Sequence, residues 1–231
     1  MKLDVLHLDN HLVVVNKPTG VPTVPDESQD VSLFDAVREH VERTFAKPGR
    51  AFIGVVHRLD RPVSGVVCFA RTSKAAARLG AAFKEHLAHK TYLGIADGVP
   101  RERGGEVLQW IAKDERTGRI VATRDESPGS KRAHTRWRVV ATAPFEGRGV
   151  ALLELVPTTG RSHQLRLAAQ SLGTPLLGDL RHGARAALAD RSVALHAARL
   201  EVEHPTLRTP SLFEAQPPDT AWWRVFESER H

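Results

Sequence analysis

The chain has 231 residues, of which 41% are hydrophobic and 26% are charged, a balance typical of a globular protein and not of a disordered one. Its net charge of +6 favours a polyanionic partner, and 25 of its 33 basic residues are arginine, which suits contacts with phosphates and bases. No apolar stretch is long enough to cross a bilayer and no signal-peptide pattern follows Met1, so we expect a cytoplasmic protein without membrane contact.

The first predicted elements are a buried strand and an amphipathic helix. Residues 12–15 are consecutive apolar residues that indicate the strand, and Asn16–Gly20 has the composition of a turn. Ser32 is a suitable N-cap for a helix whose apolar residues recur at helical spacing as far as Phe45. Residues 47–50 then close this helix with a proline and a glycine.

A second strand and helix follow. The strand at residues 66–70 contains the only cysteine, Cys68, which we expect to be a buried thiol; a disulfide framework is excluded. Thr72 or Ser73 is placed to cap a helix that covers residues 74–87, with its apolar residues on one face.

The rest of the chain is dominated by strand patterns. A strand is predicted at residues 91–96, whereas residues 101–135 are charged and turn-rich and predict short strands at best. Residues 137–141 and 150–156 have the pattern of paired strands, and residues 192–202 indicate a last long strand.

This order of elements predicts an α+β fold, with a mixed, mostly antiparallel sheet and flanking helices. We see neither an internal repeat nor a separating linker, so we expect a single domain that spans residues 1–231. A monomer is the working expectation.

The most informative polar segment is His57–Gly65, which lies between two apolar strands. It places Arg58 and Asp60 in a loop, and a carboxylate that leaves water needs a partner. The residues alone leave two interpretations open: a structural ion pair at a strand end, or a functional carboxylate.

A second polar segment is Thr158–Arg166. One of its two threonines is placed to cap a predicted helix over residues 161–172, whose first N–H groups would face a nearby anion. His163 and Arg166 are three residues apart and are expected on one helix face. The alternative is a solvated helix start without a function.

These segments resemble the RluA family of pseudouridine synthases. His57–Gly65 is similar to the family signature H-R-L-D-x-x-T-S-G, except that Val63 replaces the usual threonine, which puts one local hydrogen bond in doubt. Further blocks resemble the family in order and spacing: Asn16–Gly20, Lys90–Tyr92, Gly160–Arg166, Gly178–Asp179, Leu195–Ala197 and His204–Pro205. The resemblance covers residues 11–205 and does not include the N-terminal S4-type RNA-binding domain that many relatives carry.

The resemblance implies an RNA pseudouridine synthase that acts on ribosomal or transfer RNA, with neither a cofactor nor a metal. It implies that Asp60 is the catalytic carboxylate, that Arg166 pairs with it and that Tyr92 stacks on the target base. It also implies that Arg58 fills the space left by the flipped uridine. As contacts to RNA phosphates, it suggests three further residues: Lys17, Arg161 and His163.

Two other functional classes remain open at this point. One is a non-catalytic RNA-binding protein that retains the fold, although its Asp60, Tyr92 and Arg166 are all present. The other is a hydrolase that uses Asp60 with a second acid. His86 and His89 hint at a metal site, but no third ligand follows at a recognisable spacing, and a helix end explains them better.

Overall fold

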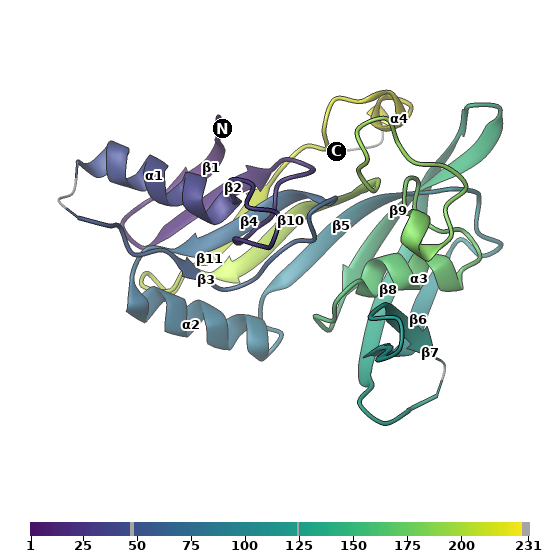
Figure 1. The fold of residues 1–231 in the computed structure, drawn as a ribbon, viewed down its shortest axis with the longest axis horizontal. Coiled ribbons are helices and arrows are strands. Elements are labelled where there is room, and N and C mark those ends of the chain that lie inside the picture. Colours follow the sequence, from purple (N-terminus) through teal and green to yellow (C-terminus); the bar gives the residue numbers. More distant parts are fainter. Residues whose placement is uncertain (47–48, 124, 228–231) are drawn as a thin grey trace. The chain divides into compact units, whose positions relative to one another are not determined.

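The computed structural model describes residues 1–46, 49–123 and 125–227, which form two compact units (Figure 1). Unit 1 is built from two separate stretches, Met1–Lys90 and Ala197–Pro217. Unit 2 comprises Thr91–His196 together with the chain that follows Pro218. The expectation of a single domain stays a prediction, and the units are described one at a time.

A sheet forms the centre of unit 1. Its strands lie in the order β1 (Asp4–Leu8), β2 (Leu12–Lys17), β4 (Ser64–Ala70) and β10 (Leu195–Glu203), with β3 (Gly54–Val55) paired to β4 and β11 (Pro210–Glu214) paired to β10. The central strands β2 and β4 are antiparallel, with Val14 opposite Cys68. The strands predicted at residues 12–15 and 66–70 are therefore confirmed.

The two helices of unit 1 are α1 (Leu33–Phe45) and α2 (Ser73–Lys84). Ser32 caps α1 by accepting a hydrogen bond from the Asp35 N–H, and Thr72 caps α2 in the same way. Both caps agree with the sequence-based expectation. Part of the predicted end of α1, residues 47 and 48, lies outside the described residues.

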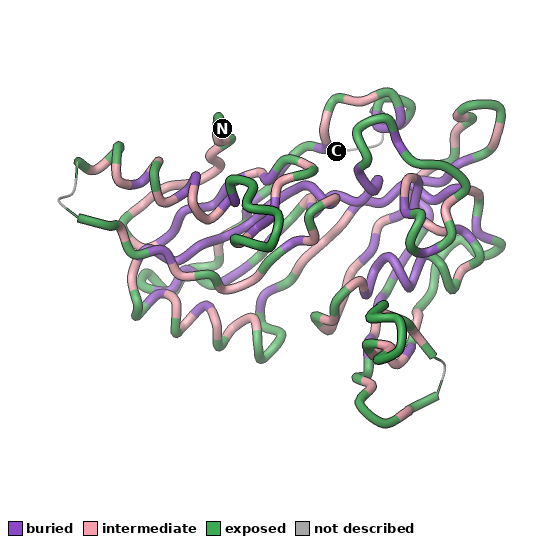
Figure 2. The backbone as a smooth tube through the Cα atoms, viewed as in Figure 1, coloured by how far each residue is buried: buried purple, intermediate pink, exposed green. Residues whose placement is uncertain are grey.

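The central strands of unit 1, β2 and β4, are buried on both faces. Every residue of β4 is buried, and Figure 2 shows the central strands as continuous buried tube. Alternate residues of β4 pack with Leu79 of α2 and with Phe213 of β11 in one apolar cluster. Cys68 belongs to this cluster and is fully buried, as predicted; burial raises the pKa of its thiol to about 12.

Unit 2 contains a second run of strands. They lie in the order β5 (His89–Ala96), β9 (Arg148–Pro157), β8 (Lys131–Phe145), β6 (Gly104–Lys113) and β7 (Ile120–Thr123). Each adjacent pair in this run is antiparallel. The helical elements are α3 (Gln164–Ser171), the short 3₁₀ helix η1 (Leu180–His182) and α4 (Ala221–Arg224). These strand-rich units with few helices confirm the α+β fold class.

The prediction that residues 101–135 contain only short strands is wrong. β6 is 10 residues long, and β8 begins at Lys131 and runs for 15 residues. Only Gln109 and Ile111 of β6 are buried, and its other positions are exposed or half-buried. Long one-sided strands need few apolar residues, so their pattern is weak in the sequence. Within the described chain, no helix is long and apolar enough to span a membrane.

Candidate catalytic site

Asp60 lies in the loop between β3 and β4. Leu59 is buried, whereas Arg58 is exposed and Asp60 is half-buried. The loop turns directly after Asp60, where the Val63 N–H donates to the Asp60 carbonyl over 3.0 Å. Val63 is itself buried, so its β-branched side chain fills an apolar position in the turn.

The main chain on each side of Asp60 is held by the segment that follows β2. The Thr23 hydroxyl donates to the Leu59 carbonyl over 2.8 Å and accepts from the Leu59 N–H over 3.2 Å. Gly20 and Arg61 exchange two further hydrogen bonds, each 2.9 Å long. The carboxylate of Asp60 is therefore presented by a loop whose two flanking residues are both anchored.

Lys17 completes this anchorage from the interior. Its amino group is fully buried and donates to the carbonyls of Pro18, Val21 and Arg61, over 2.9, 2.7 and 3.1 Å. The pKa of Lys17 is lowered to about 7, mainly because the amino group is buried. The nearby charge of Asp60 raises this pKa, and the charge of Arg61 lowers it. Only the ammonium form has three N–H donors, so this geometry is that of the charged lysine.

This position bears on the expected phosphate contact of Lys17. The structure places the amino group among backbone carbonyls, with 0% of the residue exposed, and not at the surface where RNA would lie. Lys17 and Thr23 both bond to main-chain atoms beside Asp60, and we call these two side chains the clamp of the Asp60 loop. No motif in the amino-acid sequence identified Thr23 as a residue that supports the Asp60 loop.

Two further residues of the His57–Gly65 segment stabilise the local structure. A Cβ at Gly65, whose φ is +118°, would lie 2.5 Å from the Ala197 N atom, so only glycine lets β4 and β10 approach this closely. His57 accepts the Cys68 N–H over 2.9 Å and stacks on Phe83. Burial lowers the pKa of His57 to about 3, so its ring is neutral.

The second polar segment is organised around Gln164 in unit 2. The Gln164 side-chain oxygen accepts from the Thr159 hydroxyl over 2.7 Å and from the Arg161 N–H over 3.1 Å. Its NH₂ group donates to the His134 carbonyl and the Thr135 hydroxyl of β8. All the bonding capacity of this buried amide is used, and the loop before α3 is thereby fixed to β8.

The prediction that Thr158 or Thr159 caps this helix is wrong. The helix begins at Gln164, and the N-cap is His163, which has φ 55° and makes no side-chain capping bond. The backbone at His163 is left-handed, so the helix begins three residues later than expected. At the other end, Gly173 has φ +76° in the C′ position.

Arg166 forms a buried ion pair that the sequence analysis did not include. Its Nε and one terminal nitrogen donate to the two carboxylate oxygens of Asp179, over 2.8 and 2.6 Å. The exposed fractions of the two side chains are 5% and 0%. Asp179 belongs to a sequence block that resembles the family, but no role was assigned to it.

The expectation that His163 and Arg166 share a helix face is also wrong. Arg166 points into the interior toward Asp179, whereas the Nδ1 atom of His163 lies 2.9 Å from Nε2 of His182. His163 precedes the helix in a left-handed conformation, so the three-residue spacing does not apply.

The structure distributes the predicted site residues over both units. Asp60, Arg58 and Lys17 belong to unit 1. The others belong to unit 2: Tyr92, Arg161, His163 and Arg166. Tyr92 is half-buried on β5 opposite Leu155, and the Arg161 Nε donates to the Arg132 carbonyl. Pairing of Arg166 with Asp60 stays a prediction.

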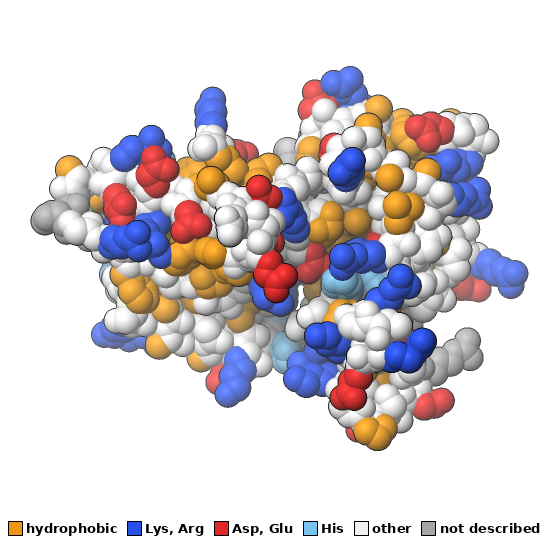
Figure 3. All heavy atoms as spheres, viewed as in Figure 1, with side chains coloured by type: hydrophobic (Ala, Val, Ile, Leu, Met, Phe, Trp, Pro, Cys, Tyr) orange, Lys and Arg blue, Asp and Glu red, His pale blue; other side chains and the backbone are white. Residues whose placement is uncertain are grey.

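The surface of the molecule carries many cationic side chains. Figure 3 shows lysine and arginine side chains around a histidine patch over α3 and β7 of unit 2. Across the described residues, no three histidine, cysteine or acidic side chains come together as metal ligands.

Comparisons with known proteins point in one direction. Residues 11–171 match the family model of RNA pseudouridylate synthase. An uncharacterized RNA pseudouridine synthase of Bacillus subtilis, YhcT, is 35% identical over 94% of this chain and 68% of its own length. The dual-specificity RNA pseudouridine synthase RluA of Haemophilus influenzae is 35% identical over 93% of each chain.

Solved structures agree with these sequence matches. Human RNA pseudouridylate synthase domain containing 4 superimposes with a TM-score of 0.76 and 25% identity, over 94% of this chain and 89% of its own. Human RNA pseudouridylate synthase domain containing 1 gives a TM-score of 0.74 and 27% identity, over 94% and 84%. The chain, with Asp60 in its anchored loop and a family match over residues 11–171, belongs to the RNA pseudouridylate synthase family and to the RluA group within it.

Proposed function

We propose that the protein converts a specific uridine of ribosomal or transfer RNA to pseudouridine, with Asp60 as its catalytic carboxylate. Relatives that share about a third of its sequence are named for both RNA classes. One is the ribosomal large subunit pseudouridine synthase D of Zymomonas mobilis, 33% identical, and another is the tRNA pseudouridine synthase C of Salmonella typhi, 32% identical. The observation that carries the assignment of Asp60 is its loop, anchored on both sides and interior to the family match.

The reaction is an isomerisation. The C1′–N1 bond of the uridine breaks, the base turns, a C1′–C5 bond forms, and a proton leaves C5 while N1 gains one. Atoms and electrons balance without water or an external redox partner, so one carboxylate suffices where a hydrolase needs two. Asp60 supplies that carboxylate, and the clamp of Lys17 and Thr23 holds it in place.

The remaining residues take the roles that the resemblance implies. Arg58 is exposed two residues before Asp60, with the buried Leu59 between them, so Arg58 is available to enter the space left by an extruded base. Tyr92 stacks on that base, and Arg166 balances the charge of Asp60 while Asp179 holds its guanidinium.

Mapping of pseudouridine in total RNA, with and without this gene, tests the proposal. We expect loss of pseudouridine at one or a few positions in ribosomal or transfer RNA, and restoration by the wild-type gene. An unchanged map would contradict the proposed activity.

The purified protein should also keep its activity after dialysis against a chelator, and a loss of activity that a metal ion restores would count against the metal-free mechanism.

A further inference from the structure

Unit 2 contains a cavity of about 830 Å³ that holds none of the proposed catalytic residues. One wall is α3, which contributes Leu167 and Gln170, together with His163 directly before the helix. A second wall is the turn and strand from residue 117 to residue 122, and the third is η1. Its volume is within the range of sites that bind small ligands.

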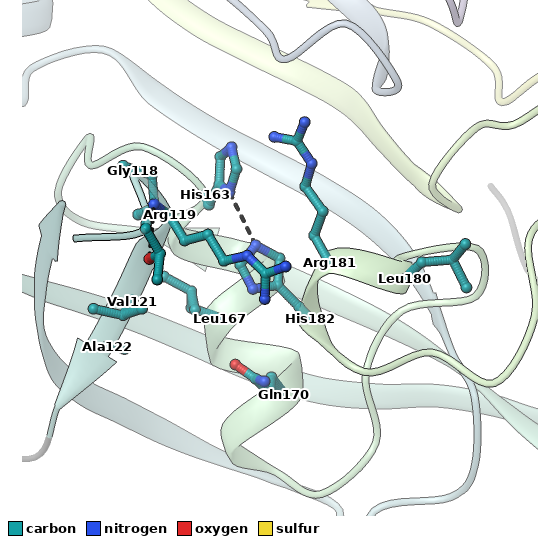
Figure 4. A pocket seen from close by; sticks show the side chains of 12 residues that line it. Gly118, Arg119, Val121, Ala122, His163, Leu167, Gln170, Leu180, Arg181 and His182 are labelled. Atoms are coloured by element: carbon teal, nitrogen blue, oxygen red, sulfur yellow. Dashed lines mark hydrogen bonds between the residues drawn. The ribbon is translucent and has the colours of Figure 1, made fainter. Parts of the chain in front are cut away.

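Cationic and histidine side chains reach this cavity from all three walls. Arg119 comes from the turn before β7, Arg181 and His182 come from η1, and His163 precedes α3. Figure 4 shows the two arginine side chains extending beside the His163–His182 hydrogen bond. None of the residues that line the cavity is acidic, so its field favours an anion.

Hydrogen bonds within the protein hold the walls of the cavity in place. His182 is 4% exposed and bonds to His163 over 2.9 Å, which joins η1 to the start of α3. Asp114 shapes the turn that carries Arg119, since its carboxylate accepts from the Arg116 and Thr117 N–H groups and its own N–H donates to the Arg119 carbonyl. Asp114 does not line the cavity, although its charge and that of Arg119 interact.

The remaining lining is apolar or neutral. Val121, Ala122 and Leu167 form an apolar wall, and Gln170 is exposed with an amide that can both donate and accept hydrogen bonds. A group with a charged end, a flat apolar body and polar edges fits this lining. A nucleotide has those three features, whereas an acidic peptide side chain lacks the apolar body.

We propose that this cavity binds one nucleotide of the RNA outside the target uridine, with its phosphate between Arg119, Arg181 and the His163–His182 pair. The inference rests on the proposed function, since it takes RNA as the substrate. The same nucleotide would bridge α3 and η1, which also frame the Arg166–Asp179 pair. Binding there would stabilise the element that carries Arg166.

The first test is RNA binding by a double variant, Arg119→Ala with Arg181→Ala. Both side chains are exposed, so the fold should tolerate their removal. Arg116→Ala with Arg136→Ala is the matched control, because both arginines are exposed, neither lines the cavity and the change in charge is equal. The probe is a fluorescein-labelled 12-nucleotide RNA of mixed sequence, titrated at several KCl concentrations.

We expect the cavity variant to raise Kd about tenfold and to reduce the slope of log Kd against log salt by about one, as loss of a phosphate contact does. The control should change Kd less than about threefold. Equal effects of the two double variants would overturn the proposal. If the cavity variant alone weakens binding while the gene deletion leaves the pseudouridine map unchanged, the proposed function fails and the RNA-binding cavity stands.

The second test identifies the ligand by NMR of ¹⁵N-histidine-labelled protein. Adenosine 5′-monophosphate should shift the His163 and His182 signals, adenosine should do so less, and the Arg119→Ala, Arg181→Ala variant should not respond. Inorganic phosphate that binds as tightly as the nucleotide would overturn the nucleoside part of the proposal. Displacement of the nucleotide by a short polyglutamate peptide at equal concentration would overturn it in favour of an acidic protein partner.

Discussion

The Asp60 loop of unit 1 and the start of α3 in unit 2 are the two polar segments of the chain, and they are held in different ways. The Asp60 loop is anchored through main-chain atoms of Leu59 and Arg61, which bond to the clamp residues Lys17 and Thr23. Around α3, side chains bond to each other, and the Arg166–Asp179 pair is sealed from water. The bonds from the clamp to the Asp60 loop use main-chain atoms beside Asp60, whereas the carboxylate of Asp179 itself bonds the Arg166 guanidinium.

The largest expected effect follows from this contrast between the two aspartates. Asp60→Asn should reduce pseudouridine formation below about a thousandth of the wild-type rate, as the loss of a nucleophile or general base does. RNA affinity should stay within about tenfold, because phosphate contacts supply most of it. Tritium release from [5-³H]uridine RNA and filter binding measure the two quantities. Turnover at a tenth of the wild-type rate would remove Asp60 from its role.

Asp179→Asn should act mainly on stability. It removes the buried carboxylate that accepts two hydrogen bonds from the Arg166 guanidinium, and breaking a buried pair costs about 3 kcal/mol or more. Urea unfolding monitored by circular dichroism measures the change. The control is Asp219→Asn, which disrupts an Arg–Asp pair of the same bidentate geometry at the surface and should cost much less stability. Equal costs would show that burial of the Arg166 pair is unimportant.

Lys17→Met tests the clamp against the phosphate contact that the family resemblance suggests. The methionine keeps most of the length of the side chain but removes the donor that joins three carbonyls, and only the Arg61 carbonyl keeps another, the Gly20 N–H, so we expect a fall in kcat of about tenfold or more through a looser loop. Kd for RNA should change less than about twofold. Lys74→Met removes an exposed lysine of unit 1 as the control. A larger Kd with an unchanged kcat would instead support the phosphate contact.

Arg58→Ala separates base extrusion from support of the loop. The uridine of a short single-stranded RNA avoids most of the extrusion cost of a few kcal/mol, so the variant should lose about tenfold more activity on the folded substrate. Asp60→Asn serves as the comparison, because it should fail equally on both RNAs. The experiment needs a short RNA that the wild-type protein modifies measurably. Equal losses for Arg58→Ala would assign Arg58 to the loop.

The smallest expected effect concerns Asp9, whose carboxylate accepts from the ring Nε2 atoms of His7 and His204 and from two backbone N–H groups. Burial raises the pKa of Asp9, but these hydrogen bonds outweigh it and hold the pKa below the ordinary value of 3.8. The carboxylate therefore contributes stability at pH 7 that is lost as the pH falls below about 4.

Asp9→Asn should accordingly reduce the free energy of unfolding by about 1 kcal/mol at pH 7, with a difference that shrinks between pH 4 and pH 3. Urea titrations at these pH values measure it. Asp4→Asn, at an exposed carboxylate, is the control. A difference that grows as the pH falls would contradict the assigned sign.

What the sequence predicts well is local in the chain. The caps at Ser32 and Thr72 and the apolar runs at residues 12–15 and 66–70 depend on neighbours a few residues away, and all four appear in the structure. The resemblance located Asp60 in its loop. The weak pattern of β6 was misjudged because few residues of that strand are buried.

The contacts that organise the site are instead distant in the chain. Lys17 reaches a carbonyl 44 residues later, and Thr23 bonds to a residue 36 positions away. The Arg166–Asp179 pair depends on the loop that returns from α3, and His163 takes a left-handed conformation that is uncommon for any residue other than glycine. Such pairings arise from the fold, and neither composition nor periodicity encodes them.

The discontinuity of unit 1 has a consequence for synthesis of the protein. Leu200, Val202 and Phe213 belong to the same apolar cluster as Leu12 and Val66, so the first 90 residues leave the ribosome without part of their core. The sequence of unit 2 from Thr91 to His196 emerges before that core can close. Apolar strand surface of unit 1 therefore stays uncovered until residues 197–217 have been translated, and during this interval unit 1 most needs protection from aggregation.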